Sequence, residues 1–222
     1  MRMSGTKPTL TYFNFAGRGE VPRLILELAG TDYEWVGLSF HGSEGGDWGE
    51  YKSQHGEALA FGQVPRYQDP EAGLDLVQSN AITRCLAQKH GFNGTNETEA
   101  ALIDMFNEGI GEFGLCGGKA VFAPPGEDPS KVAELRGKFL SEDLPKWLGF
   151  FERALAKNGT GYFVGENVSY ADLQLLVVLH FLFRMEGVRE GLEHFPRVKA
   201  TYEKLANLPK IKAYYDSKPY SF

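Results

Sequence analysis

Three short stretches of the sequence combine residue types that can do chemistry. The first, Tyr12–Glu20, places a phenol just before a glycine-hinged turn, where its hydroxyl can donate a hydrogen bond. The second is Gly62–Pro65, and the third, Gln78–Ile82, opens a predicted helix with a polar pair. Backbone N–H groups at a helix N-terminus favour an anion such as a carboxylate. Each stretch also has a purely structural interpretation. Tyr12 could be a core residue of a strand, Val64-Pro65 an ordinary turn with a trans bond, and Ser79 a simple helix N-cap.

The residues up to about Lys89 have the pattern of a small α/β unit that positions these stretches. Thr9–Phe13 is rich in aromatic and β-branched residues, which predicts a strand. Val21–Ala29 has apolar residues at helical spacing and is followed by Gly30 as a stop. The elements predicted next are a strand at Tyr33–Val36, a glycine-rich loop over Phe40–Gly62, a hairpin around Asp69-Pro70 and a helix from near Ser79. The order β-α-β-loop-β-β-α predicts an α/β unit of the size of thioredoxin.

The second half of the sequence is helical. Apolar residues from Leu102 to Phe113 fall on one stripe, and those from Val132 to Leu155 predict a long helix that Pro145 kinks. Ser169 and Asp172 form a capping-box pattern before the apolar run to Phe183, which predicts a buried core helix. With a polar linker at Gly91–Glu97, we expect an α/β domain over residues 1–90 and an all-α domain over 98–222.

Composition excludes several classes of protein. The 222 residues are 42% hydrophobic and 23% charged, as in a packed globular protein rather than a disordered or fibrous one. A net charge of −6 argues against general nucleic-acid binding, and no run approaches the roughly 20 apolar residues of a membrane span. Only Cys85 and Cys116 occur, which excludes a disulfide framework and a cysteine zinc site. Without a signal peptide's apolar core, the polar N-terminus favours the cytoplasm.

Taken in order, the three stretches resemble those of the cytosolic glutathione transferases of the tyrosine type (pi, mu, alpha and sigma). The resemblance runs over nearly the whole chain and includes the Ser169–Asp172 cap and the ending around Leu208–Ile211. It implies a thioredoxin-like N-terminal domain, an all-α C-terminal domain and a homodimer. It also implies an enzyme that joins the glutathione thiolate to soft hydrophobic electrophiles, with glutathione as co-substrate and no metal or other cofactor.

The resemblance also assigns roles to single residues. Tyr12 is implied to be catalytic, because a phenol that donates a hydrogen bond to the sulfur lowers the thiol pKa. The implied glutathione contacts are Phe13, Arg18 in a supporting role, Trp48, Lys52, Gln63, Val64, Pro65 after a cis bond, Gln78, Ser79, and Glu112 acting on the neighbouring subunit. Phe15 and Phe122, together with Phe13, match positions that line the electrophile pocket, which Phe222 could close. Phe61 matches an aromatic residue that inserts into the partner subunit.

The sequence departs from the family pattern at Ala16, where some relatives carry a basic residue, and in two longer segments. Gly114, Gly117 and Gly118 stand where a continuous helix is expected, and each interior glycine costs about 0.5–1 kcal/mol relative to alanine. We therefore predict that this helix ends early or bends. The loop before Gln63 is also longer than the family pattern.

Two other functions within the same resemblance stay open. One is a glutathione-dependent isomerase like the prostaglandin D synthases of the sigma group. The other is a structural or ligand-carrying relative without turnover, like the lens S-crystallins, although the intact set of predicted contacts argues against it. A thiol transferase or dehydroascorbate reductase would need a cysteine at the position of Tyr12 or Asn14, so these two activities are not expected.

Overall fold

A computed structural model describes residues 7–39, 46–122 and 127–217. Its contacts divide the chain into two compact units. The first unit holds the residues up to His90 together with a short stretch from Ala213, and the second holds Gly91–Lys212. The C-terminal stretch therefore groups with the N-terminal half, which the sequence did not suggest.

The first unit is built on a mixed sheet of four strands. Its strands are β1 (Thr9–Phe13), β2 (Glu34–Leu38), β3 (Arg66–Asp69) and β4 (Leu74–Val77). They lie in the order β2-β1-β3-β4, with β1 parallel to β2 and the other pairs antiparallel. The hairpin predicted around Asp69-Pro70 is confirmed as β3 and β4.

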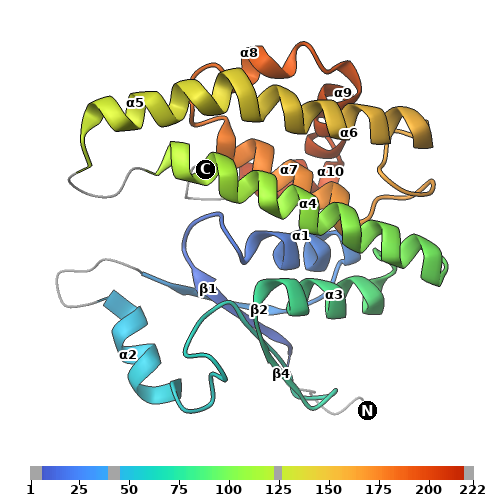
Figure 1. The fold of residues 1–222 in the computed structure, drawn as a ribbon. Coiled ribbons are helices and arrows are strands. Elements are labelled where there is room, and N and C mark those ends of the chain that lie inside the picture. The colour runs from blue at the N-terminus through green and yellow to red at the C-terminus, as the bar shows by residue number, and fades with distance from the viewer. Residues whose placement is uncertain (1–6, 40–45, 123–126, 218–222) are drawn as a thin grey trace. The chain divides into compact units, whose positions relative to one another are not determined.

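Two helices pack together on the sheet, and a third stands away from them (Figure 1). They are α1 (Glu20–Ala29) and α3 (Ser79–His90), with α2 (Gly46–His55) as the third. Leu24 and Ile25 of α1 and Leu86 of α3 are fully buried, which follows from their helical spacing. Helix α1 ends where predicted, because Gly30 takes the left-handed conformation (φ 69°) that caps a helix. The predicted α/β class of this unit is confirmed.

The prediction of a loop over Phe40–Gly62 is wrong for the part that forms α2. Few residues of α2 pack against the sheet. Its aromatic stripe is weak and consists of Trp48, Tyr51 and His55. Polar residues and glycines fill the rest of α2, so the sequence lacks the apolar period from which helices are predicted. Residues 40–45 of the predicted loop lie outside the described residues.

The second unit is all-α, as predicted. Its helices are α4 (Glu97–Val121), α5 (Pro129–Lys138), the π-helical turn η1 (Phe139–Asp143), α6 (Leu144–Asn158), α7 (Tyr170–Leu182), α8 (Val188–Leu192), α9 (Pro196–Ala206) and α10 (Pro209–Asp216), whose last turn belongs to the first unit. The π-turn interrupts the predicted long helix and ends two residues before Pro145, which cannot donate a backbone hydrogen bond.

Helix α4 corrects the prediction drawn from its glycines, since it runs without a break through all three. A β-carbon on Gly114 would lie 3.0 Å from Cγ2 of Val178 in α7. One on Gly117 would overlap Leu182, also in α7. Gly114 and Gly117 therefore let α4 and α7 approach closely, and this packing offsets their helix-breaking tendency.

The predicted start of α7 is confirmed as a capping box. The carboxylate of Asp172 accepts hydrogen bonds from the backbone N–H of Ser169 at 2.8 Å and from its hydroxyl at 2.6 Å. It also accepts the N–H of Phe163 at 3.0 Å. Asp172 thus ties the preceding loop to the helix that forms the centre of this unit.

Candidate active site in the first unit

Tyr12 is held at the end of β1 by the turn that follows it. Its side chain is 6% exposed, and its hydroxyl accepts a hydrogen bond from the backbone N–H of Arg18 at 3.1 Å. A β-carbon on Gly19 would lie 2.7 Å from the Tyr12 ring, and one on Gly17 would lie 2.9 Å from its hydroxyl. Both glycines are therefore needed for the backbone to wrap around the ring, a role that the sequence motif alone did not reveal.

The electrostatics of this turn keep the Tyr12 phenol protonated near neutral pH. Burial raises the pKa of Tyr12 above 10, while the N–H and the positive charge of Arg18 partly offset that shift. Because the hydroxyl acts as acceptor toward Arg18, its own proton is left for a ligand. Tyr12 can therefore act as a hydrogen-bond donor.

Aromatic side chains extend from Tyr12 along the surface of the first unit. The rings of Phe13 and Phe15 are stacked with their centroids 5.6 Å apart, and Phe15 also lies 5.7 Å from Tyr12. Trp48 of α2 meets Phe13 edge-on at 5.6 Å. Since Phe15 is 42% exposed, this cluster offers an apolar surface beside the phenol.

The second and third stretches of the sequence meet beyond the end of the β3–β4 pair. Arg66 pairs with Val77, so Pro65 and Gln78 both flank the last pair. The Val64-Pro65 bond is cis, as the resemblance implied. The side-chain amide of Gln78 donates to that of Gln63 at 3.2 Å, which brings the two predicted contacts together.

The start of α3 has an unusual backbone. Gln78 takes a φ of 75°, which among the described residues no other residue except glycine does. Its carbonyl accepts the N–H of Ile82 at 3.0 Å, so the helix begins with Ser79 as its first residue. Ser79 is partly exposed and stands where the backbone N–H groups of a helix start lack partners within the helix.

Of the two predicted residues of α2, Lys52 lies next to the Gly62–Pro65 stretch. The ammonium of Lys52 lies 5.7 Å from the centre of the Trp48 ring, and its Cε lies 3.9 Å from where a β-carbon on Gly62 would stand. Lys52 is therefore next to the residue that precedes Gln63. Phe61, just before Gly62, is 66% exposed.

The remaining predicted residues belong to the second unit. Glu112 is exposed on α4, and Phe122 at the end of α4 is 62% exposed and lies 5.2 Å from the ring of Phe181. Phe222 lies outside the described residues. All other predicted residues belong to the first unit, and among them Phe61 is predicted to contact another subunit.

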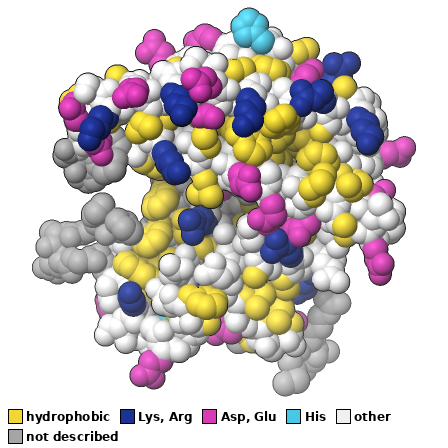
Figure 2. Space-filling view, viewed as in Figure 1, with side chains coloured by type: hydrophobic (Ala, Val, Ile, Leu, Met, Phe, Trp, Pro, Cys, Tyr) yellow, Lys and Arg dark blue, Asp and Glu magenta, His cyan; other side chains and the backbone are white. Residues whose placement is uncertain are grey.

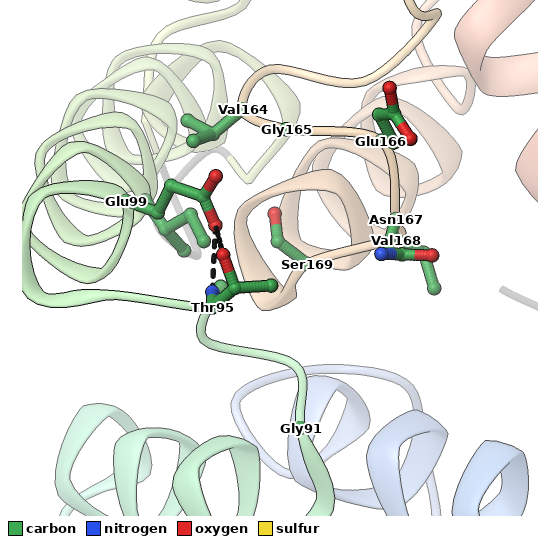
Figure 3. Close-up of a pocket in the computed structure, with 11 residues that line it drawn as sticks. Gly91, Thr95, Glu99, Val164, Gly165, Glu166, Asn167, Val168 and Ser169 are labelled. Carbon is green, nitrogen blue, oxygen red and sulfur yellow. Dashed lines mark hydrogen bonds between the residues drawn. The ribbon is translucent and has the colours of Figure 1, made fainter.

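The second unit also has a cavity of about 330 Å³, lined by the start of α4, the segment before it and the loop before α7. Figure 3 shows the carboxylate of Glu99 turned toward Thr95, whose N–H and hydroxyl donate to it at 2.7 and 2.8 Å. None of the residues predicted for chemistry lines this cavity. The carboxylate and the hydroxyl instead fasten the segment before α4 to the helix.

Two properties of the described residues bear on other kinds of site. No described helix is both long and apolar enough to cross a bilayer. Three or more His, Cys, Asp or Glu side chains do not come together at any place in the described ranges where they could hold a metal ion.

Comparisons with known proteins cover most of the chain. The family described as Glutathione S-transferase, N-terminal domain, matches residues 8–88, and Glutathione S-transferase, C-terminal domain, matches residues 119–218. Glutathione S-transferase P 1 of Xenopus laevis is 35% identical over 88% of this chain and 85% of its own length.

Solved structures agree with these matches in fold. Monomeric Na-GST-3, a glutathione S-transferase from the hookworm Necator americanus, superposes with a TM-score of 0.83 and 29% identity, covering 97% of this chain and 99% of its own. Prostaglandin synthase D of Nilaparvata lugens superposes with a TM-score of 0.79 and 29% identity, covering 96% of this chain and 99% of its own.

Proposed function

The chain belongs to the glutathione S-transferase family and is a glutathione transferase, and we propose that Tyr12 is its catalytic residue. An ordinary thiol has a pKa near 8.5, so most of it is protonated at pH 7. A phenol that donates a hydrogen bond to the sulfur favours the thiolate, which is the nucleophile. The observation that supports this role is the buried Tyr12 ring, wrapped by Gly17 and Gly19, whose hydroxyl accepts a hydrogen bond from the N–H of Arg18. Burial also raises the pKa of this hydroxyl, which favours its role as a donor.

Glutathione would lie along the predicted contact residues of the first unit. Ser79 and Gln78, at the start of α3, would bind the γ-glutamyl end, where the helix N-terminus favours its carboxylate. Val64, before the cis-proline, would pair with the cysteinyl part through its main chain. Trp48, Lys52 and Gln63 would hold the glycyl end, Phe13 would contact the tripeptide, and Arg18 would support the local positive field. We propose no metal or redox cofactor beyond this co-substrate.

The electrophile would be soft and hydrophobic. Phe15 exposes an aromatic face beside Tyr12, and Phe122 in the second unit exposes another. An isomerase of the prostaglandin D synthase kind is a second candidate, because one of the similar structures is a prostaglandin synthase D. Parallel assays separate the two: conjugation of glutathione to an aryl halide, and glutathione-dependent isomerisation of a prostaglandin endoperoxide. Conjugation as the faster reaction supports the transferase, and isomerisation as the faster one supports the alternative.

We propose that the protein works as a homodimer in the cytoplasm, without a nucleic-acid or membrane partner. Figure 2 shows hydrophobic side chains exposed between charged ones over the second unit. Met105 of α4 and Phe150 of α6 are both exposed apolar residues. The exposed Phe61 of a partner could be buried on such a surface, and Glu112 would then act on the partner's glutathione. Because a similar structure is described as monomeric, the oligomeric state needs its own test.

A further inference from the structure

Arg66 makes three hydrogen bonds in the first unit although no sequence motif pointed to it. It follows Pro65 directly, and its side chain is buried. Its Nε donates to Asp75 Oδ1 at 2.7 Å, and its Nη2 donates to Asp75 Oδ2 at 2.5 Å. Asp75 stands diagonally across the β3–β4 pair on the same face. The planar guanidinium is thus fixed in direction by a two-pronged contact.

The third hydrogen bond of Arg66 joins the sheet to α2. Nη1 of Arg66 donates to the hydroxyl of Tyr51 at 3.2 Å. The guanidinium also lowers the pKa of Asp75, so the carboxylate stays charged and the contact persists near neutral pH. Arg66 therefore connects the hairpin next to the cis-proline with the helix that carries Trp48 and Lys52.

Tyr51 lies on the same face of α2 as the two predicted glutathione contacts, so its bond to Arg66 bears on where that face points. Trp48, Tyr51, Lys52 and His55 stand at positions i, i+3, i+4 and i+7, which share one face of a helix. On this face Trp48 contacts Phe13, and the ring of Tyr51 lies 4.4 Å from that of His55. The first turn is held separately, where Asp47 accepts the Ser39 hydroxyl at 3.1 Å.

Packing alone holds α2 weakly, because none of its described side chains is fully buried. A helix with so little buried apolar area has low local stability. The hydrogen bond from Arg66 to Tyr51 therefore contributes much of what holds α2 in one orientation.

We propose that Arg66 and Tyr51 are positioning residues that hold α2 so that Trp48 and Lys52 face the glycyl end of glutathione. This inference rests on the proposed function. It predicts that loss of the Tyr51 hydroxyl weakens binding of the glycyl part of glutathione alone. The γ-glutamyl and cysteinyl parts are held by α3 and the cis-proline segment, which α2 does not carry.

The test compares two ligands, glutathione and γ-glutamylcysteine, which lacks the glycine. Dissociation constants are measured by isothermal titration for the wild type, for Tyr51→Phe and for Tyr67→Phe as a matched control. Tyr67 is a buried tyrosine of β3 whose hydroxyl donates to Asp69, at 3.3 Å, and not to Arg66. Tyr51→Phe keeps the ring and removes only the hydrogen bond to Arg66.

The wild type should bind glutathione more tightly than γ-glutamylcysteine. In Tyr51→Phe the dissociation constant for glutathione should rise roughly three- to tenfold, which corresponds to the net contribution of one ordinary hydrogen bond. The constant for γ-glutamylcysteine should stay within about twofold of the wild type, and kcat at saturating glutathione should be unchanged. Tyr67→Phe should leave the ratio of the two constants as it is in the wild type.

Other outcomes overturn the inference in distinguishable ways. Equal weakening of both ligands in Tyr51→Phe, or no weakening of either, would contradict a positioning role while leaving the proposed function intact. A wild type that binds the two ligands equally well would show that α2 does not hold the glycyl end. A wild type that binds neither ligand would contradict the proposed function itself.

Discussion

Gly117 of α4 lies against Leu182 of α7 so closely that a β-carbon on the glycine would overlap the leucine side chain. The same β-carbon would lie 2.9 Å from Cζ of Phe139, which is also buried. Helix α4 therefore keeps a helix-weakening residue where the contact between helices requires one. The two helices depend on this glycine for their packing.

Gly117→Ala should destabilise the protein by about 1–3 kcal/mol, the usual cost of overpacking a core. Gly111→Ala is the matched control, because a β-carbon there would meet nothing within 4 Å. That variant should stabilise the protein by about 0.5–1 kcal/mol through helix propensity. Urea unfolding of the three proteins measures both effects, and a stabilised Gly117→Ala variant would show that α4 and α7 are not closely packed.

Ser79→Ala should weaken glutathione binding, because hydrogen bonds to a charged group contribute about 1.5–3 kcal/mol each. Ser130→Ala is a suitable control, since Ser130 also stands in the first turn of a helix but in the second unit. Isothermal titration with glutathione compares the two. Wild-type affinity in Ser79→Ala would mean that this serine only caps α3.

Phe61→Ala should raise the dimer dissociation constant by two or more orders of magnitude. Burial of one such side chain contributes about 1.5–3 kcal/mol, and a two-fold interface uses it twice, at about 1.4 kcal/mol per tenfold change. Phe15→Ala, another exposed phenylalanine of the first unit, should leave the dimer unchanged. In sedimentation equilibrium, a monomeric wild type or an equally tight variant dimer would remove Phe61 from the interface.

Asp69 should make the stability of the first unit depend on acid pH. Its carboxylate accepts a hydrogen bond from Lys89 at 2.6 Å, which holds the pKa of Asp69 below its usual value. A lowered pKa in the folded state contributes stability above the unfolded pKa of about 3.9 that is lost as the pH falls through the folded value.

The unfolding free energy should therefore decline below about pH 4, and Asp69→Asn should flatten that decline while lowering stability at pH 7. Asp32→Asn serves as control, because Asp32 is an exposed partner of Lys7. Denaturant unfolding between pH 2 and 7 measures all three proteins. An acid decline as steep in Asp69→Asn as in the wild type would assign the pH dependence to other groups.

The sequence predicted the residues that carry local signals better than those that depend on distant contacts. Gly30 and the Ser169–Asp172 box were readable because a helix end is determined by its own few residues. The glycines of α4 were misread, since their cost is local while the compensating contact comes from α7. The bond from Arg66 to Tyr51 had no sequence signal, because it joins side chains of two elements 15 residues apart.

The most direct test of the account is the pKa of the glutathione thiol bound to the wild type and to Tyr12→Phe, followed by thiolate absorbance. The variant should bind glutathione with nearly unchanged affinity, since only the bond to the sulfur is lost. Its bound thiol should have a higher pKa, and conjugation of an aryl halide should fall at least roughly tenfold. An unchanged thiol pKa in Tyr12→Phe would contradict the assignment of Tyr12 as the catalytic residue.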